Sequence, residues 1–100
     1  MDIGIISWEF SGKVTHWRGP APYHFIAVPE YVAGALHDMA SAVSYGWGVI
    51  PVTVRIGETT FTTSLFPKDG GYLVPIKDKV RKGEALVIGD VVSVELMLGS

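Results

Sequence analysis

Hydrophobic and polar residues alternate along three long parts of the chain. In residues 4–16 the even positions are mostly apolar and the odd positions mostly polar. The even positions carry Ile6, Trp8, Phe10, Val14 and His16. A period of two is typical of a half-buried β-strand, and residues 50–56 and 92–98 show it as well. Gly12 interrupts the first apolar row, so we expect a bulge or a sharp bend there.

Shorter strands are separated by glycine and proline turns. Residues 17–22, WRGPAP, predict a loop, and residues 23–28 predict a second strand after it. Gly57 and Glu58 fit a two-residue hairpin turn between residues 50–56 and the next strand. After the KDGG turn, residues 72–76 form a further strand. Pro75 lacks an N–H group, which places it at a sheet edge or a bulge.

A helical spacing interrupts the strands once. Pro29 suits the first position of a helix, and the apolar residues after it recur at spacings of four, three and four. These residues are Val32, Leu36, Met39 and Val43. We therefore predict a helix over about residues 30–45, ended by Gly46 and docked on the sheet. Residues 77–82 are long enough for a short helical turn only.

These elements predict a mainly β fold. About six strands with closely spaced turns and one helix indicate a small β-barrel, closed or partly open, with the helix packed against it. One hundred residues are enough for one core and leave no room for a second. We expect a single domain over residues 1–100.

The tight turn fixes which residues of the hairpin face each other. With Ile56 opposite Thr59, the register pairs Val52 with Thr63 on the core side and Pro51 with Ser64 on the outer side. Thr59, Thr60 and Thr62 are then assigned to the hairpin and the outer surface, as the strand propensity of threonine favours. Thr63 differs, because an unpaired inward hydroxyl costs about 1–3 kcal/mol. It should bond a backbone carbonyl, a water or a ligand.

Composition narrows the classes of function. With 48% hydrophobic and 18% charged residues, the chain is too apolar to be disordered. A formal net charge of −2 argues against broad attraction to nucleic acid or to anionic lipid. Five basic residues lie within residues 68–82, but two aspartates interrupt them, which favours a solvated face over a phosphate-binding patch. The first ten residues fit neither a signal peptide nor a spanning helix, so we expect a soluble, cytoplasmic protein.

The residue types of several catalytic sites are present without their spacing. Ser64, His24 and Asp69 have the types of a hydrolase triad, but no Gly-x-Ser-x-Gly turn surrounds the serine. The chain has no cysteine, and its three histidines are not spaced as a helix or hairpin ligand pair requires. No glycine-rich phosphate loop is present. We expect no metal and no cofactor, and a hydrolase is the least favoured interpretation.

The order of motifs resembles a known family. The motifs comprise Tyr23, Phe25 and Pro29, then Gly48, Pro51 and Val52, then TSLFP at residues 63–67, then Lys77, Val80 and Arg81, then Gly89, Asp90 and Val92. Together they are similar to the small bacterial family called domain of unknown function 1905. The resemblance implies a compact β-barrel domain and implies no activity. The closing strand also resembles the swapped-hairpin barrels of transition-state regulators, some of which bind DNA.

The leading functional hypothesis is a non-enzymatic barrel that binds a small molecule or assembles with copies of itself. A site at the barrel mouth would be formed by Thr63, Ser64, Trp17, Tyr23, His24 and Arg81. Arg81 has an alternative structural role, since it could pair with an acid or cap backbone carbonyls. Self-association would use an uncovered strand edge or the Ala/Gly-rich helix face. DNA binding of the regulator type is the other alternative, although we do not expect a nucleic-acid or membrane partner.

Overall fold

The computed structural model describes residues 6–17, 23–43 and 50–98. In chain order the elements are β1 (Ile6–Trp17), β2 (Tyr23–Ala27), α1 (Glu30–Val43), β3 (Ile50–Ile56), β4 (Thr59–Lys68), β5 (Gly71–Ile76), α2 (Asp78–Gly83) and β6 (Val91–Leu98). Each strand and helix predicted from the pattern is present. Trp17 lies in β1 rather than in the loop, and the predicted helix end at Gly46 lies outside the described residues.

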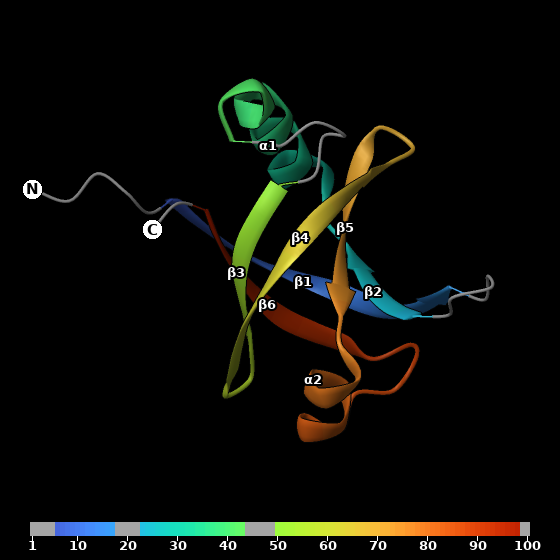
Figure 1. The fold of residues 1–100 in the computed structure, drawn as a ribbon. Coiled ribbons are helices and arrows are strands. Elements are labelled where there is room, and N and C mark those ends of the chain that lie inside the picture. The colour runs from blue at the N-terminus through green and yellow to red at the C-terminus, as the bar shows by residue number, and fades with distance from the viewer. Residues whose placement is uncertain (1–5, 18–22, 44–49, 99–100) are drawn as a thin grey trace, which may run out of the picture.

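The six strands close into an antiparallel barrel. Going around the barrel, their order is β1, β2, β5, β4, β3 and β6, with β6 returning to β1 (Figure 1). Every pair is antiparallel, so neighbouring strands can be joined by short turns. The prediction of a small β-barrel is confirmed in its closed form. One chain supplies all six strands, so closure requires no exchange of hairpins between copies.

The hairpin of β3 and β4 has the register that the turn predicts. Val52 pairs with Thr63 and Pro51 with Ser64, and the ladder runs without interruption from Ile50–Leu65 to Ile56–Thr59. Thr63 is half-buried rather than fully buried. Its hydroxyl therefore keeps contact with solvent and avoids the full penalty of an unpaired buried group.

Strand β1 changes partner near its middle. It pairs with β6 over Ile6–Lys13 and with β2 over Val14–Trp17. The register with β6 is continuous through Gly12, so the predicted bulge is absent from that ladder. Glycine is required here for another reason: a Cβ at this position would overlap Cγ2 of the buried Ile26. Gly12 thus allows β1 and β2 to approach where the strand changes partner.

Proline marks the start of α1 and the limit of one ladder. The carbonyl of Pro29 accepts the N–H bonds of Val32 and Ala33, so this proline immediately precedes the helix instead of opening it. Pro75 pairs with Phe25 of β2, while the ladder of β5 with β4 covers only residues 71–73 of β5. The missing N–H of Pro75 therefore lies beyond the β4–β5 ladder, at a local edge.

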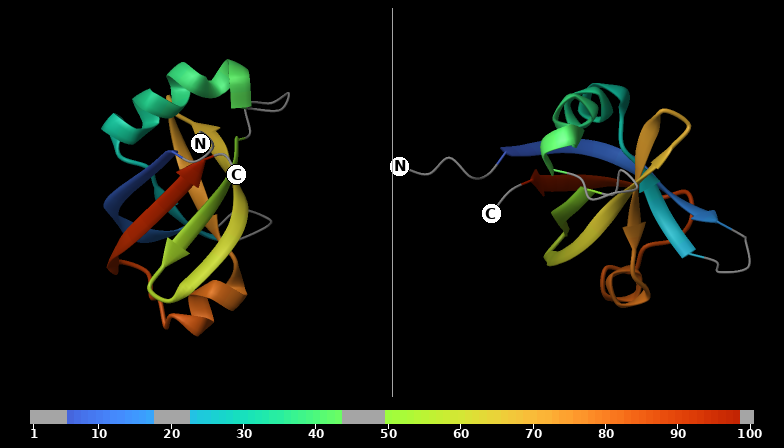
Figure 2. Two further views of the ribbon diagram at one scale, coloured as in Figure 1. Left: turned by 90° about the vertical axis from the view of Figure 1, so that its left-hand side faces the viewer. Right: turned by 45° about the horizontal axis from the view of Figure 1, so that its top comes forward.

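The two helices lie at opposite ends of the barrel. Figure 2 shows α1 over one end and α2 under the other. Val32 and Leu36 of α1 are fully buried, as the helical spacing predicts, and Met39 packs on the same core. Val80 of α2 joins the core from the other end. Both helices therefore close the barrel with apolar side chains, and their polar faces remain at the surface.

Candidate functional site

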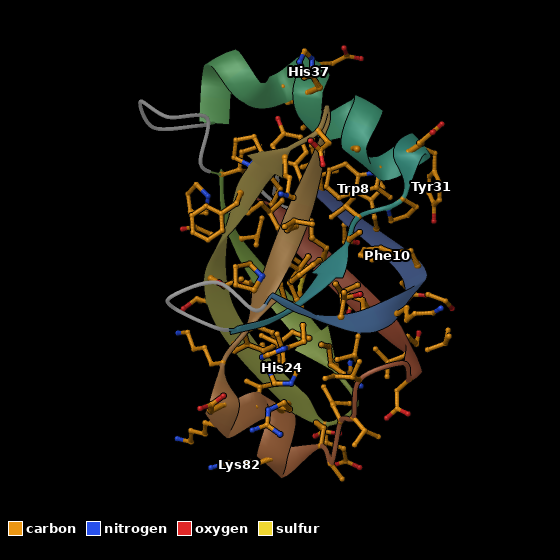
Figure 3. The ribbon with its side chains drawn as sticks, turned by 90° about the vertical axis from the view of Figure 1, so that its right-hand side faces the viewer. Trp8, Phe10, His24, Tyr31, His37 and Lys82 are labelled. Carbon is orange, nitrogen blue, oxygen red and sulfur yellow. The ribbon has the colours of Figure 1, made fainter. Side chains whose placement is uncertain are left out.

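Two histidines face each other at the α2 end of the barrel. His16 of β1 pairs directly with His24 of β2, and both side chains are half-buried. Their ring centroids are 4.8 Å apart and the ring planes are tilted by 51°. Because side chains alternate along a strand, His16 and His24 point to the same side as the buried Val14 and Ile26. Figure 3 shows His24 beside α2, while His37 lies at the far end on α1.

Helix α2 brings Arg81 to this histidine pair. The Arg81 side chain is 27% exposed, and its Nη2 lies 3.8 Å from Oδ1 of Asp78. Asp78 is largely exposed, so this pair contributes little to stability. The Nε of Arg81 is buried and has no hydrogen-bond partner among the described residues. The alternative role of Arg81, pairing with an acid, is present in this weak form and leaves one donor unused.

The position of α2 is fixed by contacts at its two ends. Val80 is buried in the core, and Glu84 caps the helix directly after its last residue, Gly83. The Thr59 hydroxyl donates a hydrogen bond of 2.5 Å to Oε2 of Glu84, which ties α2 to the start of β4. Thr59 was assigned to the hairpin and the outer surface, and the structure corrects this: its hydroxyl is half-buried under α2. The β3–β4 turn passes so close that a Cβ on Gly57 would collide with the Glu84 carboxylate.

The charges around His24 favour an anion over a cation. Burial lowers the pKa of His24 below 6.5, the nearby Arg81 cation and His16 lower it further, and Asp78 opposes them. A metal ion bound to these imidazoles would sit beside the Arg81 guanidinium and be repelled by it. Among residues 6–17, 23–43 and 50–98, no three histidine or acidic side chains are grouped as metal ligands would be. The arrangement is therefore suited to a negatively charged group.

The remaining residues predicted for the mouth are only partly brought together. Trp17 and Tyr23 pair next to His16 and His24 in the β1–β2 ladder, but their side chains lie outside the described part of the structure. Thr63 and Ser64 are half-buried on β4, which β5 separates from β2. Among the described residues no hydrogen bond or ion pair joins these two hydroxyls to His24 or Arg81. Their role as ligand contacts stays a prediction.

The three residue types of a hydrolase triad lie apart. Asp69 is in the β4–β5 turn and lines an open hollow of about 450 Å³ beside α1, together with Glu30, His37 and Asp38. His24 lies at the opposite end, next to α2 (Figure 3). A second hollow of about 260 Å³ lies on the outer face around Arg55 and Glu95, away from both residues. The described geometry gives no support to hydrolysis through this set.

Sequence spacing missed the most specific feature of the site. His16 and His24 are eight residues apart, and we judged that no histidine pair had hairpin spacing. The structure shows the opposite, because β1 and β2 place them directly across from each other. One feature of the sequence does point to this pair: the two histidines are near the ends of two predicted strands, on either side of one loop. The pairing of the two histidines follows only from the register of β1 with β2. The sequence of the loop WRGPAP does not indicate a turn type that would fix this register.

Comparison with known proteins gives a family without an assigned activity. No curated protein matches the chain at a significant level. No helix among the described residues is long and apolar enough to cross a membrane. The family model described as Domain of unknown function (DUF1905) matches residues 10–96, which is most of the chain. The protein therefore belongs to the DUF1905 family, as its motif order predicted.

Proposed function

We propose that this barrel binds a small anion at its α2 end, between His24 and Arg81. The observation that carries the proposal is the buried Nε of Arg81, which has no partner among the described residues and belongs to a side chain whose positive charge acts on His24. A buried donor without a partner costs about 1–3 kcal/mol, so native proteins seldom keep one. An oxygen of a bound anion would accept this bond.

The chemistry of the arginine supports an oxyanion as the ligand. A guanidinium has five donors in a planar fork, which matches the oxygens of a carboxylate, sulfate or phosphate group. The weak pair with the exposed Asp78 leaves most of these donors available. The surroundings of His24 lower its pKa and so favour the neutral imidazole, which has one ring N–H that can donate to the same anion.

The flanking elements support a preformed site. Val80 and Ile76 are buried behind it, and Thr59 and Glu84 hold the end of α2. The exposed lysines of this segment, Lys77, Lys79 and Lys82, add positive charge around the mouth. A preformed group of donors limits the ordering that binding requires and so favours affinity for a small ligand.

The test is titration calorimetry with sulfate, phosphate and acetate at constant ionic strength, with chloride as the balancing anion. We expect at least one oxyanion to bind the wild-type protein, and Arg81→Gln to weaken its affinity about 10- to 100-fold by removing a charged hydrogen-bond donor. Arg55→Gln is the matched control, because Arg55 is an exposed arginine on the outer face, paired with Glu95.

Two results would contradict the proposal. One is the absence of heat and of any melting-temperature shift with all three anions. The other is an equal loss of affinity in Arg55→Gln and Arg81→Gln, which would indicate general charge attraction instead of a site. Circular dichroism of Arg81→Gln and binding by Arg81→Lys, which keeps the charge, separate lost binding from lost folding.

A further inference from the structure

We infer that the preferred anion carries two negative charges and that its binding places a proton on His24. The inference rests on the proposed anion site and adds the class of ligand and its coupling to pH. It follows from three nitrogen-bearing side chains on three elements. His16 on β1 faces His24 on β2, and α2, which begins two residues after the β5 partner of His24, carries Arg81, whose charge acts on His24.

The groups that face His24 lower its pKa and so disfavour its charged form in the free protein. His16 lies across the ladder from it, Arg81 and Asp78 reach it from α2, and its partner on β5 is the apolar Ile76. Within the described residues these are the charged and titratable groups beside it. A proton on His24 would add a positive charge to that of Arg81, and the largely exposed Asp78 compensates for it only weakly.

A bound anion changes this balance according to its charge. A singly charged anion neutralises the charge of the Arg81 guanidinium, so it raises the pKa of His24 only slightly. A doubly charged anion leaves one negative charge unmatched within hydrogen-bond distance of the imidazole, which favours the imidazolium. The proton comes from solvent and binds a ring nitrogen of His24, so the ligand, Arg81 and His24 together are neutral.

Because anion binding and protonation of His24 are linked, the affinity for the anion depends on pH. If binding takes up one proton, the affinity increases as pH falls, by at most about tenfold per pH unit, until free His24 is itself protonated. Phosphate monoesters belong to the class of ligand that this site would select, because they are doubly charged near neutral pH. Their own second ionisation falls in the same range, so they are poor probes of the coupling.

Sulfate and methanesulfonate are the suitable pair of probes. Both present a tetrahedral sulfur oxyanion, and both keep their charge, two for sulfate and one for methanesulfonate, across the range in which histidine titrates. Calorimetry near pH 6 and near pH 8, in buffers with different ionisation enthalpies, measures affinity and proton uptake together. For sulfate we expect net proton uptake and an affinity about tenfold higher near pH 6 than near pH 8. For methanesulfonate we expect weaker binding and little dependence on pH.

Histidine variants assign the proton. His24→Gln keeps a side-chain amide that can donate to the anion, so we expect sulfate to bind near pH 8 with less than about a tenfold change but without proton uptake near pH 6. His37→Gln is the control, because His37 is exposed on α1 at the other end of the barrel and should leave both properties unchanged.

The outcomes separate this inference from the proposed function. Sulfate binding without proton uptake, or proton uptake that survives in His24→Gln, overturns the inference and leaves the anion site standing. Equal affinity and equal uptake for methanesulfonate also overturns it. If neither anion binds near pH 6 or near pH 8, the inference fails, and the proposed function fails with it when phosphate and acetate do not bind either.

Discussion

At the scale of single residues, the histidines at the two ends of the barrel differ in their burial and in the charges around them. His24 and Arg81 are both partly buried. Burial and the positive charge of Arg81 disfavour the protonated form of His24, and the buried Nε of Arg81 has no partner among the described residues. His37 is exposed on α1, at the other end of the barrel. The residue pattern therefore points to His24 as the histidine whose protonation is coupled to its surroundings.

The lowered pKa of His24 predicts a loss of stability in mild acid. A histidine whose pKa is lower in the folded state protonates first in the unfolded chain, so stability decreases as pH falls below its ordinary value of 6.5. We expect the free energy of unfolding, measured by urea titration without oxyanions, to decrease less between about pH 7.5 and about pH 5.5 in His24→Gln than in the wild type. His37→Gln should follow the wild type. Identical slopes for all three proteins would contradict the assignment.

At the scale of elements, local sequence rules determine most of the architecture. Period-two alternation predicts β1, β3 and β6, and the two-residue turn at Gly57 predicts the register of β3 with β4, because one slip would turn Thr63 and Val52 away from the core. The order of strands around the barrel and the position of α2 depend on contacts between distant segments. Thr59 shows this limit: its sequence context indicates a surface threonine, whereas Glu84, twenty-five residues further on, gives it a partner.

The change of partner in β1 makes Gly12 sensitive to substitution. Gly12→Ala would place a methyl group 2.3 Å from Cγ2 of Ile26, a residue with no exposed surface that can move little in a packed core. We expect the free energy of unfolding to fall by about 1–3 kcal/mol. The control is Gly34→Ala on α1, where no atom lies within 4 Å of the new methyl group and helix propensity favours alanine by up to about 1 kcal/mol. Urea titration of both variants distinguishes the two effects, and equal stability of the two variants would contradict the close approach.

At the scale of the whole molecule, the barrel has two chemically different ends. The α1 end has an open hollow lined by the carboxylates of Glu30, Asp38 and Asp69. The α2 end has the His16–His24 pair, Arg81 and exposed lysines. Every strand has a strand neighbour on both sides, so self-association through an uncovered edge is not supported by the closed barrel. Association through the helix face stays a prediction.

Two residues of the proposed anion site, His24 and Arg81, are among the site residues predicted from the sequence, and His16 is not among them. They were predicted to lie at the barrel mouth; α2 begins two residues after Ile76, the β5 partner of His24, and the role of both residues as ligand contacts stays a prediction. Only the register of β1 with β2 shows that His16 faces His24, with the two ring planes tilted relative to each other. A site assembled from three elements depends on the order of strands, which alternation and turn chemistry do not encode.

The most direct test of the anion site uses the three histidines as reporters in one spectrum. Titration of the protein with sulfate, followed by ¹⁵N NMR of the imidazole rings, should shift the signals of His16 and His24 together along one saturating curve. The His37 signals, from the opposite end of the barrel, should stay in place. Equal shifts of all three histidines, or no shift of His24 at saturating sulfate, would contradict the account.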